Sequence, residues 1–275
     1  MPLPSSTHSP VPRESRLGVV GPLVLATSLL LAACAATGTA TPSASPTVSP
    51  TASPAIAAAL QQDFVDVVTL ISPSVVVIET PSGLGSGIVF NTDGDIVTNY
   101  HIVADSTQFR VTLADGRQLD GTVVGTYPPG DIAVIHVTGT NLQPATFADS
   151  SQLAVGDLVL AVGNPLGYQG SVTQGIVSAV GRTVSESASV TLSDVIQTSA
   201  EINPGNSGGA LVDLSGNVVG IPTLAALDPQ IGNVPAPGIG FAIPSNVAVD
   251  YASQLIANGV VTDTAQPSES PGVAP

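Results

Sequence analysis

The chain has 275 residues, a formal net charge of −15 and only 9% charged residues. This acidic balance argues against nucleic-acid binding, because phosphate groups are bound by clusters of Lys and Arg. The single cysteine excludes an internal disulfide framework and argues against a Cys-rich zinc site. Apolar residues make up 43% of the chain, too large a share for a disordered protein.

The first 33 residues are typical of an export signal. Arg13 and Arg16 precede an uncharged, mostly apolar run over 17–33. The run ends just before Cys34, which resembles the bacterial lipoprotein signal, in which the cysteine is lipidated and becomes the mature N-terminus. The alternative is an uncleaved signal anchor, although the run is short for a membrane span. Both alternatives predict an exported, membrane-tethered protein. The first places it in the cell envelope, lipid-anchored through Cys34 on the outer face of the bacterial cytoplasmic membrane.

Two further segments are too polar to fold. Residues 34–54 are almost entirely Ala, Thr, Ser, Pro and Gly, which predicts an extended, disordered tether. Residues 263–275 have a similar composition and predict a disordered tail. The folded domain is therefore expected over 55–262.

The first half of this domain predicts one helix followed by strands. Apolar residues at helical spacing over 55–71, stopped by Pro73, predict a short amphipathic helix. Val- and Ile-rich runs bounded by turns then predict strands. The Asp-Gly pairs at 93–94 and 115–116 indicate hairpin turns. The predicted strands cover 75–79, 87–90, 96–98, 109–113, 121–127 and 132–137.

The second half repeats this pattern after a polar connector over 138–151. Strands are predicted over 158–162, 170–182, 195–198, 210–213, 218–221 and 240–243. Residues 245–258 then predict a helix, with Ser245 as its N-cap and Gly259 as its C-cap. Many short strands, without helices between them, predict an all-β fold of barrels or sandwiches and argue against a parallel α/β sheet.

The segment 203–209 (NPGNSGG) carries the clearest chemical signal. Ser207 has a glycine two positions before it and another two positions after it. A nucleophilic serine needs an exposed hydroxyl on a tight turn, with free backbone N–H groups nearby to stabilise an oxyanion. Flanking glycines permit positive φ and close approach of a substrate. The alternative is a glycine-rich β-turn that contains a serine by chance.

A serine hydroxyl also needs a base and an orienting carboxylate. His101 follows a short apolar strand, whereas His136 lies inside one and is expected to be structural. Asp131 lies just before the apolar run 132–135, where a carboxylate can enter the barrel interior. Taken alone, Asp131 is better interpreted as a turn cap at the start of a strand. Together His101, Asp131 and Ser207 follow the chain order of the chymotrypsin-type triad.

At this point the sequence resembles the HtrA (DegP/DegS-like) family of trypsin-fold serine proteases, exported quality-control enzymes. The resemblance extends over most of the foldable chain, about residues 64–258. It is carried by GSG at 85–87, TNYHIV at 98–103, DIAV at 131–134, VGNPLG at 162–167 and the segments 172–182, 202–209 and 238–246. It implies two antiparallel six-stranded β-barrels, at about 72–140 and 150–244, closed by the C-terminal helix over 245–258.

The resemblance also implies the site and its reaction. His101 takes the proton of Ser207 as the serine attacks a peptide carbonyl, and Asp131 orients His101. Backbone N–H groups of Gly205 and Ser207, with Asn206 as a third candidate, form the oxyanion hole. The substrates are polypeptides in unfolded or damaged exported proteins, and no cofactor or metal is expected.

Three features concern specificity and assembly, and the first two depart from the family. The resemblance places Glu201, Ile202 and Ile221 at the specificity pocket, where the family usually has a small residue in place of Glu201. This carboxylate either favours Arg or Lys at P1 or turns into solvent, and we favour the second alternative. A short polar tail follows the predicted last helix, so we expect a form lacking the PDZ domains that family members commonly carry. Relatives often trimerise through N-terminal aromatic residues, which makes a homotrimer around Phe64 a candidate assembly.

The sequence leaves two other functions open. The first is a latent or non-catalytic protein-binding, chaperone-like domain on the same fold. Pro222 keeps this alternative open, because it lacks a backbone N–H in the strand expected to pair with substrate. The second is a processing protease with one dedicated substrate.

Overall fold

The computed structural model describes residues 54–139, 141–163, 171–185, 191–203, 205–228 and 234–262. The predicted export signal, Cys34, the predicted tether up to residue 53 and the predicted tail lie outside these described residues.

The first six strands form a closed antiparallel barrel, here called barrel one. The strand order is β1-β2-β3-β6-β5-β4. Turns with a positive-φ glycine join β2 to β3 and β4 to β5, at Gly94 (φ 114°) and Gly116 (φ 85°), as the Asp-Gly pairs predicted. The strands are β1 (Val75–Thr80), β2 (Gly83–Val89), β3 (Asp95–Thr98), β4 (Gln108–Thr112), β5 (Gln118–Tyr127) and β6 (Ile132–Val137).

The next six strands form a second closed barrel, barrel two, in the order β10-β11-β12-β9-β8-β7. The all-β prediction with two six-stranded barrels is confirmed. The β11–β12 hairpin is longer than the sequence predicted, because pairing continues from Gly220 opposite Pro244 to Asp228 opposite Val234. The strands are β7 (Leu158–Gly163), β8 (Ser171–Ser185), β9 (Thr191–Thr198), β10 (Ala210–Val212), β11 (Val218–Asp228) and β12 (Val234–Pro244).

Strand β6 shows why the apolar stretches that predict strands are continuous and do not alternate with polar residues. Ala133 and Ile135 belong to the interior of barrel one. Ile132 and Val134, on the opposite face, belong to a second core that also contains residues of barrel two and of two helices. A strand that is buried on both faces needs apolar residues at successive positions. The same holds for β7, where Val159 and Leu160 belong to different cores.

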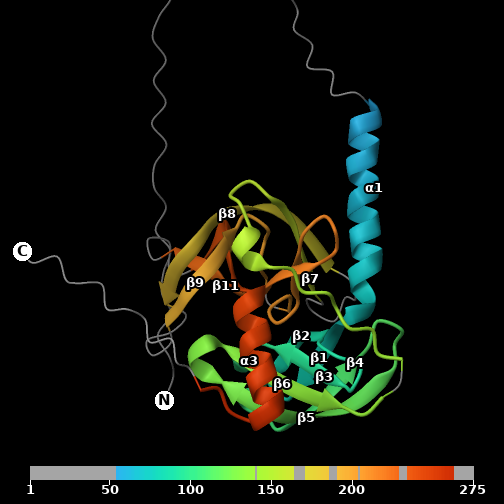
Figure 1. The fold of residues 1–275 in the computed structure, drawn as a ribbon, viewed down its shortest axis with the longest axis vertical. Coiled ribbons are helices and arrows are strands. Elements are labelled where there is room, and N and C mark those ends of the chain that lie inside the picture. Colours follow the sequence, from blue (N-terminus) through green and yellow to red (C-terminus); the bar gives the residue numbers. More distant parts are fainter. Residues whose placement is uncertain are drawn as a thin grey trace, which may run out of the picture. The chain divides into compact units, whose positions relative to one another are not determined.

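Two long helices complete this shared core, and their predicted bounds are confirmed. Helix α3 (Ser245–Asn258) contacts β5 and β6 of barrel one and β11 and β12 of barrel two, and Figure 1 shows it lying across both. Gly259 ends α3 in the left-handed conformation (φ 74°), as predicted. Ser245 is not the N-cap, because that position belongs to Pro244. The Ser245 hydroxyl instead donates to the Ala148 carbonyl at 2.6 Å.

Helix α1 (Pro54–Ile71) extends away from the strands (Figure 1). Only its C-terminal end packs on the barrels, through the buried Val67 and Ile71. Its other apolar residues are largely exposed, including Ile56 (68%) and Val65 (52%). The stretch Ala55–Ser74 is long and apolar enough to cross a membrane, a property that core helices and signal sequences share. The sequence predicted this helix but not how much of its apolar surface stays uncovered.

Short helical turns and the connector link these elements. The 3-10 helix η1 (Ser72–Ser74) joins α1 to β1, η2 (Pro128–Gly130) joins β5 to β6, and η3 (Ser150–Gln152) lies in the connector. The connector packs on barrel one through Phe147, whose ring centroid lies 5.6 Å from that of Phe90. It packs on barrel two by a parallel bridge from Phe147 to Val218.

Candidate active site

His101 lies on a one-turn helix, α2 (Tyr100–Val103), that directly follows β3. The sequence placed it at a strand end and did not predict this helix. The turn is anchored to Asp131, because Asn99 Nδ2 and the Tyr100 N–H both donate to the Asp131 carbonyl at 3.1 Å. The His101 side chain is 37% exposed. The helical turn that carries His101 is therefore fixed to the buried Asp131, while the imidazole remains accessible from outside.

Asp131 occupies the position between η2 and β6 in the left-handed conformation, with φ 51° and ψ 40°. This conformation is uncommon for residues other than glycine, although Asp tolerates it better than most, and such strain is concentrated at functional sites. Only 1% of the Asp131 side chain is exposed. The left-handed turn directs the Asp131 carboxylate into the junction of the two barrels. The sequence alone left open whether Asp131 is a turn cap or an orienting carboxylate.

The Asp131 carboxylate holds His101 from two directions. His101 Nδ1 lies 3.0 Å from Oδ2 and 3.1 Å from Oδ1 of Asp131. The backbone N–H of His101 donates to Oδ1 at 3.0 Å. Because an ionised carboxylate only accepts hydrogen bonds, the proton of a neutral imidazole lies on Nδ1. Nε2 then carries the lone pair that a general base needs.

Thr223, in β11, is the site residue that the sequence analysis missed. Its hydroxyl donates to Asp131 Oδ2 at 2.6 Å, and its carbonyl accepts from Ser207 Oγ at 3.0 Å. Thr223 thus links Ser207 of barrel two to the Asp131–His101 pair of barrel one. No local motif marks this threonine, because its role depends on the packing of one barrel against the other.

The backbone N–H groups of the turn that carries Ser207 differ in their hydrogen bonding. Those of Asn206, Gly208 and Gly209 donate to the carbonyls of Asn203, Pro222 and Asn206 at 3.0–3.1 Å. Within the part of the chain that the structure describes, the N–H groups of Gly205 and Ser207 have no hydrogen-bond acceptor. The turn therefore leaves two donors, one on each side of Asn206, beside a serine that is 8% exposed.

Comparisons with known proteins point to one family. The family model for a trypsin-like peptidase domain matches residues 85–221. The periplasmic serine endoprotease DegP of Escherichia coli K12 is 47% identical over 180 residues, which cover 65% of this chain and 37% of that protein. A solved structure of the HtrA-type protease AlgW with a tripeptide has a TM-score of 0.66 at 39% identity, covering 72% of this chain and 65% of that chain.

The serine endoprotease structure from Yersinia pestis has a TM-score of 0.62 at 36% identity and covers 72% of this chain and 68% of that chain. The chain belongs to the HtrA family of trypsin-fold serine proteases. It spans just over a third of the length of the curated relatives that it matches (35% and 37%). The resemblance that the sequence motifs indicated is therefore confirmed.

The three residues expected at the HtrA specificity pocket lie in different environments. Glu201 is exposed, and its carbonyl accepts from Thr173 Oγ1 at 2.8 Å and from Asn206 Nδ2 at 3.1 Å. Ile202 is 6% exposed and packs tightly on Gly240, where an added Cβ would lie 2.3 Å from Ile202 Cγ1. Ile221 is fully buried in the core shared by the barrels.

The second histidine of this HtrA domain also pairs with an aspartate. His136 Nδ1 lies 3.0 Å from Asp95 Oδ1, and its side chain is 40% exposed. The two residues face each other across β3 and β6, at the opposite end of β6 from Asp131. No serine contacts this pair through an Oγ hydrogen bond in the described residues, and no group of three or more His, Cys, Asp or Glu residues there could hold a metal.

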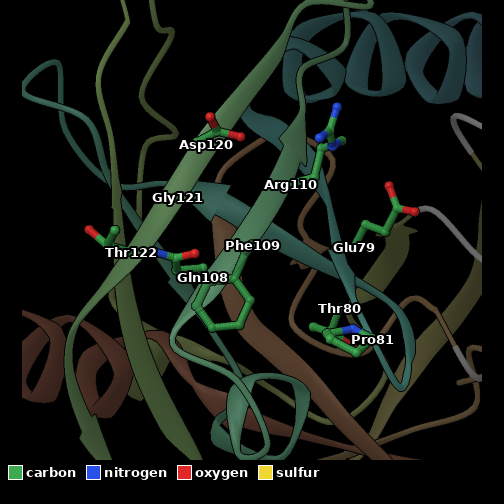
Figure 2. A pocket seen from close by; sticks show the side chains of 9 residues that line it. All are labelled: Glu79, Thr80, Pro81, Gln108, Phe109, Arg110, Asp120, Gly121 and Thr122. Atoms are coloured by element: carbon green, nitrogen blue, oxygen red, sulfur yellow. The ribbon is translucent and has the colours of Figure 1, made fainter.

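A hollow of about 490 Å³ on barrel one lies apart from the triad. Figure 2 shows Arg110 on β4 between Asp120 on β5 and Glu79 on β1. The strand register pairs Arg110 with each of these acids. Arg110 Nη1 also donates to Gln118 Oε1 at 3.2 Å. None of the predicted site residues is among those that line this hollow.

Proposed function

We propose that this chain is a serine-type endopeptidase of the HtrA type that hydrolyses peptide bonds in unfolded or damaged exported proteins. One observation carries the proposal. His101 and Asp131 of barrel one are joined through Thr223 to Ser207 of barrel two, on a turn with two N–H donors that have no acceptor among the described residues. This arrangement supplies a base, its orienting carboxylate, a nucleophile and an oxyanion site at one place.

The proposed reaction begins with attack of Ser207 Oγ on a substrate carbonyl carbon. His101 Nε2 accepts the hydroxyl proton, and the resulting imidazolium is stabilised by the buried Asp131 carboxylate. The imidazolium then donates this proton to the leaving amine as the peptide bond breaks. Water then attacks the acyl-enzyme by the same steps and releases the second product. Thr223 keeps Asp131 in place throughout, because its hydroxyl donates to the oxygen that faces His101 Nδ1.

The oxyanion hole consists of the N–H groups of Gly205 and Ser207. Asn206 shapes the turn instead. Its N–H donates to the Asn203 carbonyl at 3.1 Å, and its side-chain Oδ1 accepts from the Asn203 N–H at 2.9 Å. Loss of one oxyanion donor typically costs about 2.7–4 kcal/mol of transition-state stabilisation. This division of roles predicts that substitutions of the Asn206 side chain act through the shape of the turn.

We assign the specificity pocket to the neighbourhood of Ile202, with Ile221 acting from the core through the packing of β11. The exposed Glu201 side chain is proposed to lie in solvent, so that small aliphatic P1 residues are preferred. Pro222 does not present a backbone donor to substrate. Its carbonyl accepts the Gly208 N–H at 3.0 Å and thereby supports the nucleophile turn.

The proposed location is the cell envelope, reached through the export signal over 1–33. Lipidation of Cys34 tethers the protein to the outer face of the cytoplasmic membrane. The relatives described as periplasmic support an exported location. A homotrimer that covers the exposed apolar residues of α1 is the proposed assembly, since Phe64 is only partly buried and Ile56 and Leu60 are exposed. The substrates are polypeptides, and neither nucleic acid nor a cofactor takes part.

The test uses two histidines in matched surroundings. His101→Ala and His136→Ala each remove an imidazole that lies 3.0 Å from an aspartate and is about two-fifths exposed. We expect His101→Ala and Ser207→Ala to abolish cleavage of an unfolded protein, whereas His136→Ala cleaves like the wild type. Equal loss in both histidine variants would indicate a stability effect and contradict the assignment. Unchanged cleavage by Ser207→Ala would exclude the proposed function.

A latent protein-binding domain is the second candidate, and one contact favours it. The Ser207 hydroxyl donates to the Thr223 carbonyl, which holds its proton away from a base. Labelling by a fluorophosphonate probe separates the candidates, because only an activated serine reacts rapidly. Labelling of the wild type but not of His101→Ala supports the protease. Absence of both labelling and cleavage in the wild type supports the latent binder.

A further inference from the structure

Ser86, in strand β2 of barrel one, lies at the point where the two barrels meet behind the nucleophile turn. Its side chain is fully buried, between Gly85 and Gly87. It donates two hydrogen bonds to carbonyls of the turn in barrel two. The backbone N–H donates to the Ser207 carbonyl at 3.0 Å, and the hydroxyl donates to the Gly205 carbonyl at 2.6 Å. One residue of barrel one thus binds both residues proposed as oxyanion donors.

Ser86 is itself held in place from within barrel one. Thr98, in the neighbouring strand β3, donates its hydroxyl to the Ser86 carbonyl at 2.7 Å. Thr98 is fully buried and lies three residues before His101. The contacts of Ser86 therefore connect the strand that leads to the proposed base with the turn that carries the proposed nucleophile.

The hydroxyl of Ser86 acts on a peptide unit that could otherwise rotate. Gly205 has φ 106°, and glycine populates both signs of φ at little cost. The peptide between Gly205 and Asn206 is held on both sides. Its carbonyl accepts from Ser86, and its N–H donates to the Asn203 carbonyl at 3.1 Å. Fixing the plane of this peptide fixes the direction of the backbone on either side of it, where the Gly205 and Ser207 N–H groups lie.

Two nearby glycines show how closely residues pack around this contact. An added Cβ at Gly163, in β7, would lie 2.5 Å from Asn206 Cα and 3.1 Å from Ser86 Oγ. An added Cβ at Gly208 would lie 2.3 Å from the Ser86 carbonyl oxygen. The junction around Ser86 is therefore tightly packed. With Ala at position 86, the buried Gly205 carbonyl would lose its donor and the turn would be free to relax.

We propose that Ser86 is a positioning residue for the oxyanion hole, holding the Gly205–Asn206 peptide from the opposite barrel. This inference rests on the proposed assignment of Gly205 and Ser207 as oxyanion donors. It also means that barrel one helps to hold the oxyanion hole of barrel two in shape. Ser86 acts through the turn and does not touch the reacting atoms.

The chain supplies a closely matched control for this serine. Ser245 is also fully buried, and its hydroxyl donates to a backbone carbonyl, that of Ala148, at the same distance of 2.6 Å. Ser86→Ala and Ser245→Ala therefore remove the same kind of hydrogen bond, one at the nucleophile turn and one at the start of α3. The full-length protein is used, and thermal unfolding of each variant measures the cost to stability.

We expect Ser86→Ala to lower kcat for a peptide substrate about 10-fold or more, with KM changed less than about twofold. The affinity for a peptide aldehyde, which forms a tetrahedral adduct with an oxyanion, should fall by a similar factor. The pH dependence of kcat/KM should keep its midpoint, because the His101–Asp131 contact is untouched. Ser245→Ala should match Ser86→Ala in the loss of thermal stability but keep the wild-type kcat.

Two results would overturn the inference. One is a Ser86→Ala protein with wild-type kcat and aldehyde affinity. The other is an equal loss of kcat in both serine variants, which a purely structural role predicts. If Ser86→Ala does not fold, Ser86→Cys keeps a weaker donor on a somewhat larger side chain, and a kcat equal to wild type there contradicts the inference. Wild-type protein without cleavage or labelling would instead remove the proposed function, so the two failures are distinguishable.

Discussion

The hydroxyl of Thr223 donates to Oδ2 of Asp131 at 2.6 Å, although the two residues are 92 positions apart in the sequence. Asp131 belongs to barrel one and Thr223 to strand β11 of barrel two. Because the Asp131 side chain is only 1% exposed, each donor to its carboxylate replaces water that the buried charge has lost. The barrels are thus coupled through Asp131, the residue proposed to orient His101.

Replacing Thr223 with Val removes this donor and keeps the shape of the side chain. Hydrogen bonds to charged groups are worth about 1.5–3 kcal/mol, so we expect kcat/KM to fall roughly 10- to 100-fold. Thr223→Ser retains a hydroxyl and should stay within about threefold of wild type. Steady-state kinetics on a peptide substrate measure both variants. Equal activity of Thr223→Val and Thr223→Ser would show that the hydroxyl does not orient Asp131.

Gly208→Ala tests whether the nucleophile turn tolerates any side chain. Gly208 and Gly259 have nearly the same φ, 77° and 74°, so alanine is strained equally at both. An added Cβ at Gly208 would lie 2.3 Å from the Ser86 carbonyl oxygen, whereas no described residue lies within 4 Å of one added at Gly259. We expect a loss of about 1–2 kcal/mol in the free energy of unfolding for Gly259→Ala and about 3 kcal/mol or more for Gly208→Ala.

Urea unfolding of the two alanine variants gives these free energies, and peptide cleavage gives their activities. Gly208→Ala should also lose activity, because relief of the clash displaces the turn that carries Ser207. Gly259→Ala should keep it. The expectation fails if the two variants are equally stable and equally active.

Glu201→Ala tests the orientation of the carboxylate next to the specificity pocket. Glu201 is exposed, and the contacts that hold this segment use its backbone carbonyl. We expect the P1 preference to stay with small aliphatic residues and kcat/KM to change less than about twofold, as for other exposed charges outside a site. Profiling of cleavage sites measures this, with the exposed Glu79→Ala as control. A loss of cleavage after Arg or Lys in Glu201→Ala alone would place the carboxylate in the pocket.

Asp149→Asn tests a pH-dependent contact between the connector and α3. Hydrogen bonds from the Ser151 side chain, the Asn246 side chain and the Ser151 N–H lower the pKa of Asp149 from 3.8 to about 2. The folded state thus favours the carboxylate. Its contribution to stability is present above about pH 4 and is lost as the pH falls towards 2. Asn at this position cannot titrate.

Thermal unfolding of the wild type and Asp149→Asn between pH 2 and pH 7 measures this contribution. The wild type should be the more stable protein near pH 7, and the difference between them should shrink as the pH falls towards 2. A difference that does not depend on pH would show that Asp149 contributes only through its shape.

Local sequence patterns predicted most of the strands correctly. The apolar runs of β6 and β7 and the Asp-Gly turns each report a local constraint, either burial on both faces or a positive φ at glycine. The α2 turn was missed because its residues (YHIV) also fit the end of a strand. Its helical form depends on the hydrogen bonds from Asn99 and Tyr100 to the Asp131 carbonyl, which no local pattern contains.

The sequence alone therefore excluded the classes of function that its composition contradicts. It also determined the order of the strands along the chain and identified His101, Asp131 and Ser207 as a candidate triad. Each of these results depends on residue type and short-range spacing. Only the tertiary structure decided which groups complete the site. Thr223 and Ser86 became visible when the barrels were packed together, since each acts by a hydrogen bond to the opposite barrel. Contacts between residues about a hundred positions apart are set by burial of the shared core, and that burial is a property of the whole fold.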